Sequence, residues 1–213
     1  MDDVTTHLAD HASWTDFAER VGLPAPRRDE EYAALTAAYG EPHRHYHTLE
    51  HVASCLVLLS EHAELATSKT EVEAALWYHD AVYDAKSSRN EEKSADWAVA
   101  SLRGTDLSEE QLARIRDLIL ATRHGDPPAP GDPTLIVDVD LAILGAPPDE
   151  YQRYEVAIRK EYRWVPGFLF RKKRREILQS FLDRPAIYGT EEFRKRFEAP
   201  ARRNLEQAIA ALR

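Results

Sequence analysis

Signals for the start of a helix recur along this chain of 213 residues, and they constrain its fold more than any other feature. A Ser or Thr followed three residues later by Glu or Gln is typical of a capping box, and the pattern occurs at 70–73, 88–91 and 108–111. The segment 135–137 has strand propensity, but no second strand is available to pair with it, so we predict a helix there too. These signals predict an all-α fold of about nine helices.

Other capping residues predict where individual helices begin and end. Thr48 is the expected N-cap of a helix that runs to about residue 65. Asp29 is the expected cap of a helix over 30–39, and Asp132 that of a helix over 133–144. Pro200 fits the first turn of the last helix.

The length and composition suit one soluble globular domain over residues 1–213, with 43% hydrophobic and 31% charged residues. The single cysteine, Cys55, excludes an internal disulfide framework and lies in an apolar segment, so we interpret it as a buried small residue. The acidic start of the chain is unlike a signal peptide, and no apolar run is long enough to cross a bilayer. We therefore expect a cytoplasmic protein with no membrane partner.

Charge is distributed unevenly along the chain. The net charge of −9 argues against general nucleic-acid binding. Residues 1–150 hold 12 basic and 29 acidic residues, whereas 151–213 hold 16 basic and 8 acidic residues. The basic run at 171–175 is typical of a solvated helix face, and a phosphate-binding or nucleic-acid-binding role is the alternative.

Histidines and aspartates form a separate pattern. Five of the nine histidines lie between residues 43 and 62. His51 precedes the adjacent pair His79-Asp80 by 28 residues, and Asp140 follows Asp80 by 60. Taken alone, the pair is typical of a core histidine beside a helix cap. Two imidazoles with two carboxylates instead favour a divalent ion such as Mn, Fe, Ni, Co, Mg or Zn, with positions left open for water.

The order His51, His79-Asp80, Asp140 resembles the HD superfamily of metal-dependent phosphohydrolases. The similarity to one bacterial family of predicted HD phosphohydrolases extends over the following segments: 44–51, 78–84, 90–95, 138–145, 159–162, 177–184 and 198–205. The resemblance implies an HD core over about 30–145, with C-terminal helices over 148–213 packed on it. It also implies that His51, His79, Asp80 and Asp140 bind the metal, with Asp138 as the competitor of Asp140.

The segment 46–51 is also similar to the Tyr-His-x-x-x-His element of cyclic nucleotide phosphodiesterases. That similarity implies that His47 donates a proton to the leaving group and that Tyr46 contacts substrate. A structural loop histidine bonded to Asp84 is the alternative for His47. Asp84 matches the second acidic residue of the ppGpp hydrolase branch, although Tyr83 stands where that branch has an acidic residue. Asp84 is therefore a candidate to orient the attacking water, or a partner of Arg44 or His47.

Four further residues are candidate substrate contacts. The guanidinium of Arg44 matches the geometry of phosphate oxygens. Asn90 and Glu91 either contact substrate or cap a helix, because they belong to the 88–91 pattern. His124 either lines the pocket, binds a second metal ion, or simply ends a helix.

Together these features predict a metal-dependent phosphohydrolase that acts on a small phosphate ester or anhydride, with a nucleotide as the expected substrate. One alternative is an HD-fold hydrolase or oxygenase that acts on a non-phosphate substrate. Another is a regulatory module that binds a nucleotide without turnover. The oligomeric state stays open, with a homodimer as one option.

Overall fold

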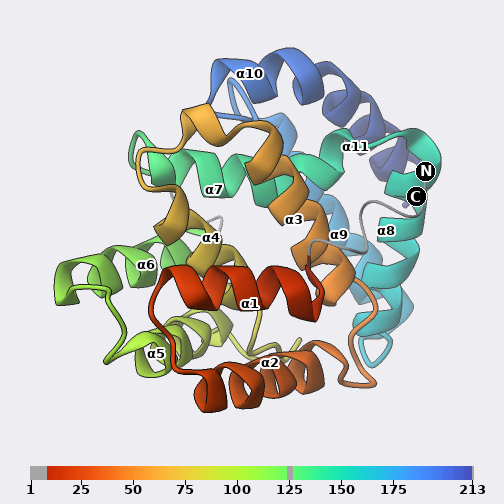
Figure 1. The fold of residues 1–213 in the computed structure, drawn as a ribbon. Helices are drawn as coiled ribbons and strands as arrows, with labels where there is room; N and C mark the ends of the chain where they lie inside the picture. Colours follow the sequence, from red (N-terminus) through yellow and green to blue (C-terminus); the bar gives the residue numbers. More distant parts are fainter. Residues whose placement is uncertain (1–8, 124–126, 213) are drawn as a thin grey trace. The chain divides into compact units, whose positions relative to one another are not determined.

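The computed structural model describes residues 9–123 and 127–212, and this part of the chain contains helices and no strand. Ten α-helices have nine or more residues (Figure 1), which confirms the all-α prediction and is close to the nine expected. The segment 135–137 lies inside α7 (Asp132–Asp140) and is helical as predicted. None of the described helices combines the length and the apolar character needed to cross a membrane.

The chain divides into two compact units, Met1–Ile136 and Val137–Arg213, with the boundary inside α7. The other elements of the first unit are α1 (His11–Arg20), α2 (Ala25–Tyr39), α3 (Leu49–Glu61), the 3-10 helix η2 (Ala63–Leu65), α4 (Lys69–Tyr78), α5 (Asn90–Leu102) and α6 (Glu109–Ala121). Those of the second unit are η3 (Leu141–Gly145), α8 (Pro148–Glu161), α9 (Gly167–Leu182), α10 (Glu191–Phe193), η4 (Arg194–Glu198) and α11 (Ala199–Ala211). The single domain over 1–213 stays a prediction.

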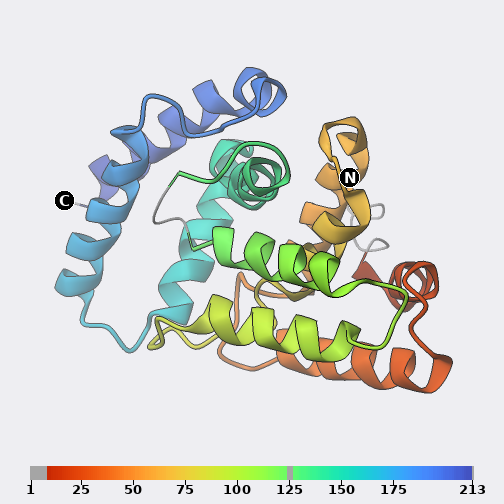
Figure 2. The same ribbon diagram turned by 90° about the vertical axis from the view of Figure 1, so that its left-hand side faces the viewer.

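Helix α4 is the central helix of the first unit. Its sequence is apolar on nearly all sides, and most of its residues are fully buried, from Val72 to Tyr78. Such a helix must be covered all round, and α3, α5 and α6 pack against it. Figure 2 shows α5 and α6 side by side.

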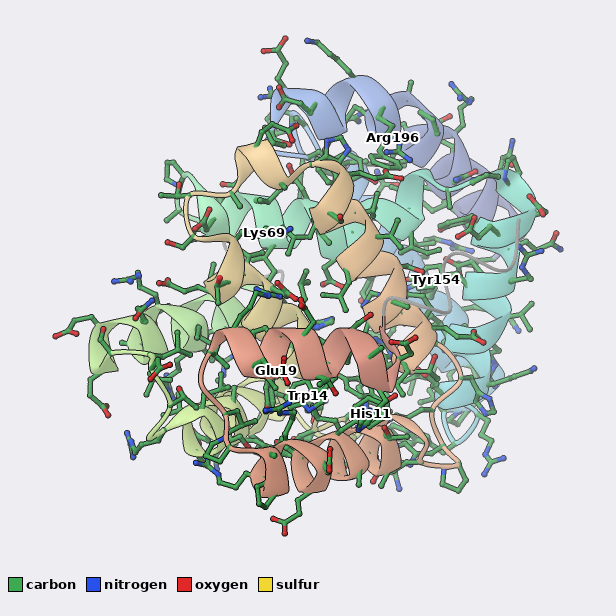
Figure 3. The ribbon with its side chains drawn as sticks, in the orientation of Figure 1. His11, Trp14, Glu19, Lys69, Tyr154 and Arg196 are labelled. Atoms are coloured by element: carbon green, nitrogen blue, oxygen red, sulfur yellow. The ribbon has the colours of Figure 1, made fainter. Side chains whose placement is uncertain are left out.

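The N-terminal helices α1 and α2 are joined through a buried tryptophan. Trp14 lies between them (Figure 3), and its indole Nε1 donates a hydrogen bond to the carbonyl of Arg28 at 2.8 Å. Its ring also contacts Trp77 of α4 edge to face, with centroids 5.2 Å apart. Trp14 therefore links α1 and α2 to the central helix.

Helix α2 begins at Ala25, earlier than predicted. Pro24 precedes it and Pro26 occupies its first turn, where a missing N–H costs nothing. Asp29 therefore lies inside the helix, where its carboxylate is 3.2 Å from His11 Nε2, and its predicted role as a cap was wrong. Thr48 is the N-cap of α3 as predicted, although that helix ends at Glu61.

Only one of the three predicted capping boxes forms. At the start of α6, Ser108 and Gln111 bond to each other's backbone N–H groups as the pattern requires. Helix α5 instead has Arg89 at its N-cap, without a side-chain hydrogen bond. Helix α4 begins at Lys69, before the predicted Thr70 cap.

A distant aspartate supplies the missing cap of α4. The carboxylate of Asp132 accepts hydrogen bonds from the backbone N–H groups of Thr67 and Ser68, at 2.7 and 2.9 Å. It therefore satisfies donors at the start of α4 rather than capping a helix over 133–144. A partner 64 residues away along the chain is invisible to local pattern analysis.

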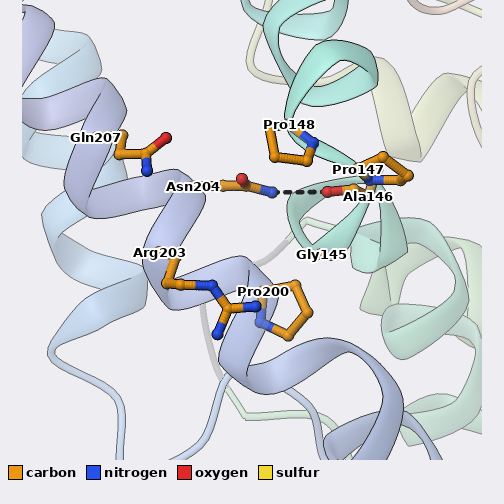
Figure 4. Close-up of a pocket in the computed structure, with 8 residues that line it drawn as sticks. All are labelled: Gly145, Ala146, Pro147, Pro148, Pro200, Arg203, Asn204 and Gln207. Atoms are coloured by element: carbon orange, nitrogen blue, oxygen red, sulfur yellow. Dashed lines mark hydrogen bonds between the residues drawn. The ribbon is translucent and has the colours of Figure 1, made fainter.

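In the second unit, α11 is fastened to the segment that follows η3. Asn204 is buried, and its Nδ2 donates to the carbonyl of Ala146 (Figure 4) and to that of Leu144, at 2.9 Å each. Gly145 approaches Phe197 closely. A Cβ added to Gly145 would lie 2.7 Å from both the Cβ and the carbonyl oxygen of Phe197. Pro200 lies in the first turn of α11 as predicted.

Candidate metal centre

The candidate site of the first unit lies where the start of α3 meets the end of α4. His51 belongs to the first turn of α3, because Thr48 begins that helix. His79 is the C-cap of α4, and Asp80 follows it directly. Packing between α3 and α4 therefore brings together residues that are 28 positions apart.

Three ligand atoms converge there. His79 Nε2 lies 3.1 Å from His51 Nε2 and 3.1 Å from Asp80 Oδ2, and the third side of the triangle, from His51 Nε2 to Asp80 Oδ2, is 3.7 Å. Nitrogen and oxygen ligands of one ion lie at such separations from each other, so these three side chains could together hold a divalent ion. The triangle fits a divalent metal ion.

The ring of His79 is also oriented as a metal-binding histidine would be. Its Nδ1 donates a hydrogen bond to the carbonyl of Leu76 at 2.9 Å, which assigns the proton of the neutral ring to that nitrogen. Nε2 then carries a lone pair that faces His51 and Asp80. Metal-binding histidines are typically fixed by this kind of hydrogen bond from the second ring nitrogen.

Electrostatics keep Asp80 in its anionic form. Burial raises the pKa of this carboxyl, but the imidazoles of His79 and His47 outweigh burial when they are protonated, and they then hold the pKa well below its ordinary value. The side chain of Asp80 is 17% exposed, compared with 4% for His51 and 1% for His79. The carboxylate therefore faces the imidazoles as a charged ligand with some access from solvent.

Arg44 is a positioning residue, and its predicted role as a phosphate contact is corrected. Its side chain has no exposed surface. Nη1 donates to the carbonyl of Asp80 at 2.5 Å, Nη2 to that of Ala81 at 2.9 Å, and Nε to Glu41 at 3.0 Å. The guanidinium also lies over the ring of Tyr39. It therefore fixes the backbone that carries Asp80, and its fork is not presented to a ligand.

An aromatic cluster stands beside the triangle. The ring of His47 stacks on Tyr83 with centroids 4.1 Å apart, and the ring of Tyr46 lies 4.7 Å from that of His51. His43 Nε2 donates to the carbonyl of Tyr83 at 2.9 Å. Tyr83, where the ppGpp hydrolase branch has an acidic residue, thus serves as the surface that orients His47.

Asp84 and Asn90 build a turn. Asn90 accepts from the backbone N–H of Asp84 at 3.1 Å and donates to its carbonyl at 3.0 Å. The carboxylate of Asp84 is exposed and accepts from the N–H of Lys86 at 2.9 Å. Asp84 and Asn90 therefore shape this turn, and the predicted catalytic role of Asp84 and substrate contact of Asn90 stay predictions.

The remaining predicted contacts lie apart from the triangle or outside the described residues. Glu91 is half-buried in the first turn of α5, where it lies 3.8 Å from Arg123 Nε. It therefore belongs to an ion pair between α5 and the segment after α6. His124 lies outside the described residues, so its role stays a prediction.

Asp138 has a structural role. It is 1% exposed, and its carboxylate accepts from Gly189 N, Thr190 N and Thr190 Oγ1, each at 2.7 Å. Burial raises its pKa despite these hydrogen bonds. Its oxygens are committed to the segment before α10, so Asp138 stabilises that segment, and the ligand role of Asp140, the last residue of α7, stays a prediction.

Cys55 also lies beside the site. The sequence alone indicates only that Cys55 is a buried residue. It is 2% exposed, and its Sγ lies 3.8 Å from His51 Nδ1 and 3.9 Å from His51 Nε2. The spacing of four residues along one helix face was the signal that could have linked the two.

No protein-family model, curated protein or solved structure matches this chain. The resemblance to the HD superfamily therefore stays a prediction from the motifs.

Proposed function

We propose that His51, His79 and Asp80 bind a divalent metal ion, and that the protein is a metal-dependent phosphohydrolase of small phosphate esters or anhydrides, with a nucleotide as the expected substrate. The observation that carries the proposal is the triangle of ligand atoms with sides of 3.1, 3.1 and 3.7 Å. The bond from His79 Nδ1 to Leu76 supports it, because that bond leaves Nε2 available as a ligand.

In this proposal the chain supplies ligands, orientation and a proton. A bound divalent ion lowers the pKa of water and polarises a phosphoryl group. Arg44 holds the backbone of Asp80, and Tyr83 orients His47 by stacking. His47 donates the proton to the leaving oxygen, because imidazole titrates near neutral pH. Asp140 is the fourth ligand by its place in the HD pattern.

The donor set also narrows the metal. Two imidazole nitrogens with a carboxylate suit borderline ions such as Mn, Fe, Co, Ni or Zn better than Mg, which prefers an all-oxygen shell. We therefore expect a transition metal in the purified protein.

The burial of Arg44 favours a second candidate, a metal-dependent hydrolase or oxygenase that acts on a non-phosphate substrate. The guanidinium assigned to phosphate binds backbone carbonyls instead. If the protein is a phosphohydrolase, other cationic side chains of the chain must contact the phosphate of the substrate. Two iron atoms per chain in mixed valence would support the oxygenase, whereas a single Mn, Ni or Co ion would not.

Metal analysis followed by a substrate screen tests the proposal. The purified chain is measured for bound metals, and phosphate release is then followed over a nucleotide panel with Mn, Co, Ni, Zn and Mg. We expect His79→Ala and Asp80→Ala to reduce bound metal to background and phosphate release by at least about 100-fold, because loss of a ligand exceeds the 10–100-fold effect of outer-shell changes.

His62→Ala is the matched control, because His62 caps the other end of α3, 3.9 Å from Glu64. It should keep both metal and activity. Unchanged metal content in His79→Ala would exclude the metal centre. Loss of metal without any phosphate release from the panel would exclude only the phosphohydrolase. A regulatory module would bind a nucleotide in the same screen without turnover.

The fourth ligand needs a separate experiment. Asp140→Asn should weaken the binding of Mn or Zn by at least about 10-fold, whereas Asp138→Asn should leave it nearly unchanged. Calorimetric titration of the metal-free variants measures both. Equal affinity in Asp140→Asn and the unmodified chain would remove Asp140 from the site.

A further inference from the structure

One short segment holds the exposed large hydrophobic side chains of the described residues. Their exposed fractions range from 39% to 72%, and they all lie between residues 156 and 177: Val156, Trp164, Phe168, Leu169 and Ile177. Trp164, Phe168 and Leu169 lie within six residues of one another at the turn between α8 and α9, and we call these three residues the α8–α9 patch. An exposed apolar cluster of this kind is typical of a docking surface.

The turn that carries the patch is well ordered. Arg159 Nη1 donates to the carbonyl of Tyr162 at 2.6 Å, and Nη2 donates to that of Val165 at 3.2 Å. The guanidinium also lies 4.6 Å from the ring centroid of Phe170. Trp164 and Phe168, at 51% and 72% exposed, are therefore displayed by a braced turn.

Positive charge surrounds the patch. Residues 159–175 contain eight basic residues and one acidic residue. Four of these cations are engaged locally. Arg174 pairs with Glu155 at 2.6 Å and Lys173 with Glu176 at 2.8 Å, while Arg159 and Arg175 donate to backbone carbonyls. Others lie exposed around the turn: Lys160, Arg163, Arg171 and Lys172. The basic run at 171–175 is thus largely a solvated face, with Arg174 as the buried exception.

A hollow of about 470 Å³ adjoins the patch between α8, α9 and α11. Val156, Phe170 and Leu212 give it apolar walls, and Arg159, Lys160 and Arg171 give it a cationic rim. Apolar walls under a cationic rim match the chemistry of a phospholipid, whose acyl chains are apolar and whose phosphate is anionic.

We propose that the α8–α9 patch docks the second unit on the surface of an anionic lipid membrane. Trp164, Phe168 and Leu169 enter the interfacial region, and Lys160, Arg163 and Lys172 contact lipid phosphates. The expectation of no membrane partner rested on the absence of a spanning segment, and peripheral attachment needs none. The inference is independent of the proposed function.

Other occupants fit the patch less well. A second copy docked through the same face would oppose two strongly basic surfaces, which is unfavourable. A nucleic acid would neutralise the charge and could stack on Trp164, but it would leave the aliphatic side chain of Leu169 in water. A membrane accounts for both the apolar side chains and the charge.

Vesicle sedimentation with the full chain tests the proposal. We expect at least about 10-fold stronger binding to vesicles with roughly 30% phosphatidylglycerol than to pure phosphatidylcholine, and weaker binding at high salt. Trp164→Ser/Phe168→Ser should reduce binding at least about 10-fold, because it removes the inserted apolar area.

Charge variants supply a matched pair. Arg163→Gln/Lys172→Gln removes two charges at the patch and should weaken binding several-fold. Lys195→Gln/Arg196→Gln removes two exposed charges of η4, outside the patch, and should change binding little. Equal effects of the two pairs would overturn the proposal, since binding would then follow net charge alone. This comparison holds even if the Trp164→Ser/Phe168→Ser variant folds poorly.

Tryptophan fluorescence locates the contact. Trp14 and Trp77 are fully buried and Trp97 is half-buried with its Nε1 bonded to Glu31, whereas Trp164 is 51% exposed, so we expect a blue shift on adding vesicles to report mainly on Trp164. Trp164→Phe should still sediment with vesicles but lose most of the blue shift.

Three results would each refute membrane docking. The first is no binding to the anionic vesicles. The second is a dimer in size-exclusion chromatography with light scattering that Trp164→Ser/Phe168→Ser converts to a monomer, since the occupant would then be a second copy. The third is tighter binding to a single-stranded RNA oligonucleotide that is lost in the same variant.

Discussion

Two buried aspartates of this chain have opposite surroundings. Asp80 faces the ring nitrogens of His51 and His79, and its pKa is held low against the effect of burial. Asp138 faces three hydrogen-bond donors from Gly189 and Thr190, and burial raises its pKa. One carboxylate is surrounded by potential ligands, the other by backbone donors.

This difference indicates that the role of an aspartate in an HD-like motif follows from the groups that contact its carboxylate and not from its spacing in the sequence. The HD pattern implies Asp140 as the fourth ligand with Asp138 as its competitor, and three hydrogen bonds now account for the carboxylate of Asp138 without a metal. A carboxylate that already accepts three short hydrogen bonds stabilises the fold. A carboxylate that lies beside two imidazole nitrogens belongs to a donor set that can bind a cation.

The largest expected effect is on the free energy of unfolding, where substitutions of Asp80 and Asp138 should differ most. Asp138→Ala leaves the N–H groups of Gly189 and Thr190 without their acceptor and should lower the free energy of unfolding by about 3 kcal/mol. Asp80→Ala in metal-free protein should cost less than about 1 kcal/mol, because no comparable set of donors depends on it. Urea unfolding of both variants measures the two losses of unfolding free energy. Equal losses would contradict the proposed difference between the aspartates.

The second effect is the stabilisation by bound metal, which should differ between substitutions of Asp80 and Asp138. Saturating metal at 100 times its dissociation constant should stabilise the unmodified chain by about 2.7 kcal/mol. Asp80→Asn should abolish this gain, and Asp138→Asn, although less stable, should retain it. Thermal unfolding with and without metal, reversed by a chelator, provides the measurement. A retained gain in Asp80→Asn would show that Asp80 is no ligand.

A smaller effect concerns the support of Asp80. Arg44→Lys keeps the charge but loses the fork that holds the carbonyls of Asp80 and Ala81, which should cost about 2 kcal/mol in stability. Metal affinity should fall several-fold as well. Arg89→Lys is the control, because Arg89 is 70% exposed and pairs only at the surface with Glu92. If Arg44→Lys lost substrate affinity alone, the original assignment to phosphate would be restored.

The smallest effect tests the turn after the site. Asn90→Ala removes both bonds to the backbone of Asp84 and should cost about 1 kcal/mol. Metal affinity should be unchanged, measured by the same titration as for Asp80→Asn. A large loss of metal binding would return Asn90 and Asp84 to the functional site.

Local sequence was sufficient for the fold class and for part of the site. Caps, prolines and apolar spacing act within one or two helical turns, so the all-α class and the cap at Ser108 followed from them. The adjacency of His79 and Asp80 is covalent, and the spacing of His51 and Cys55 is set by the pitch of one helix. These features needed no knowledge of packing.

Only the tertiary structure decided which polar groups meet. It brought His51 to His79 across 28 residues, Asp132 to the start of α4, and Asp138 to Thr190. It also buried Arg44, whose type alone suggested a phosphate ligand. Such contacts depend on how helices pack, and a buried polar group takes whichever partner packing provides, because leaving it unpaired costs more. The sequence by itself determined the helices and the candidate ligands, and packing decided which of them share a site.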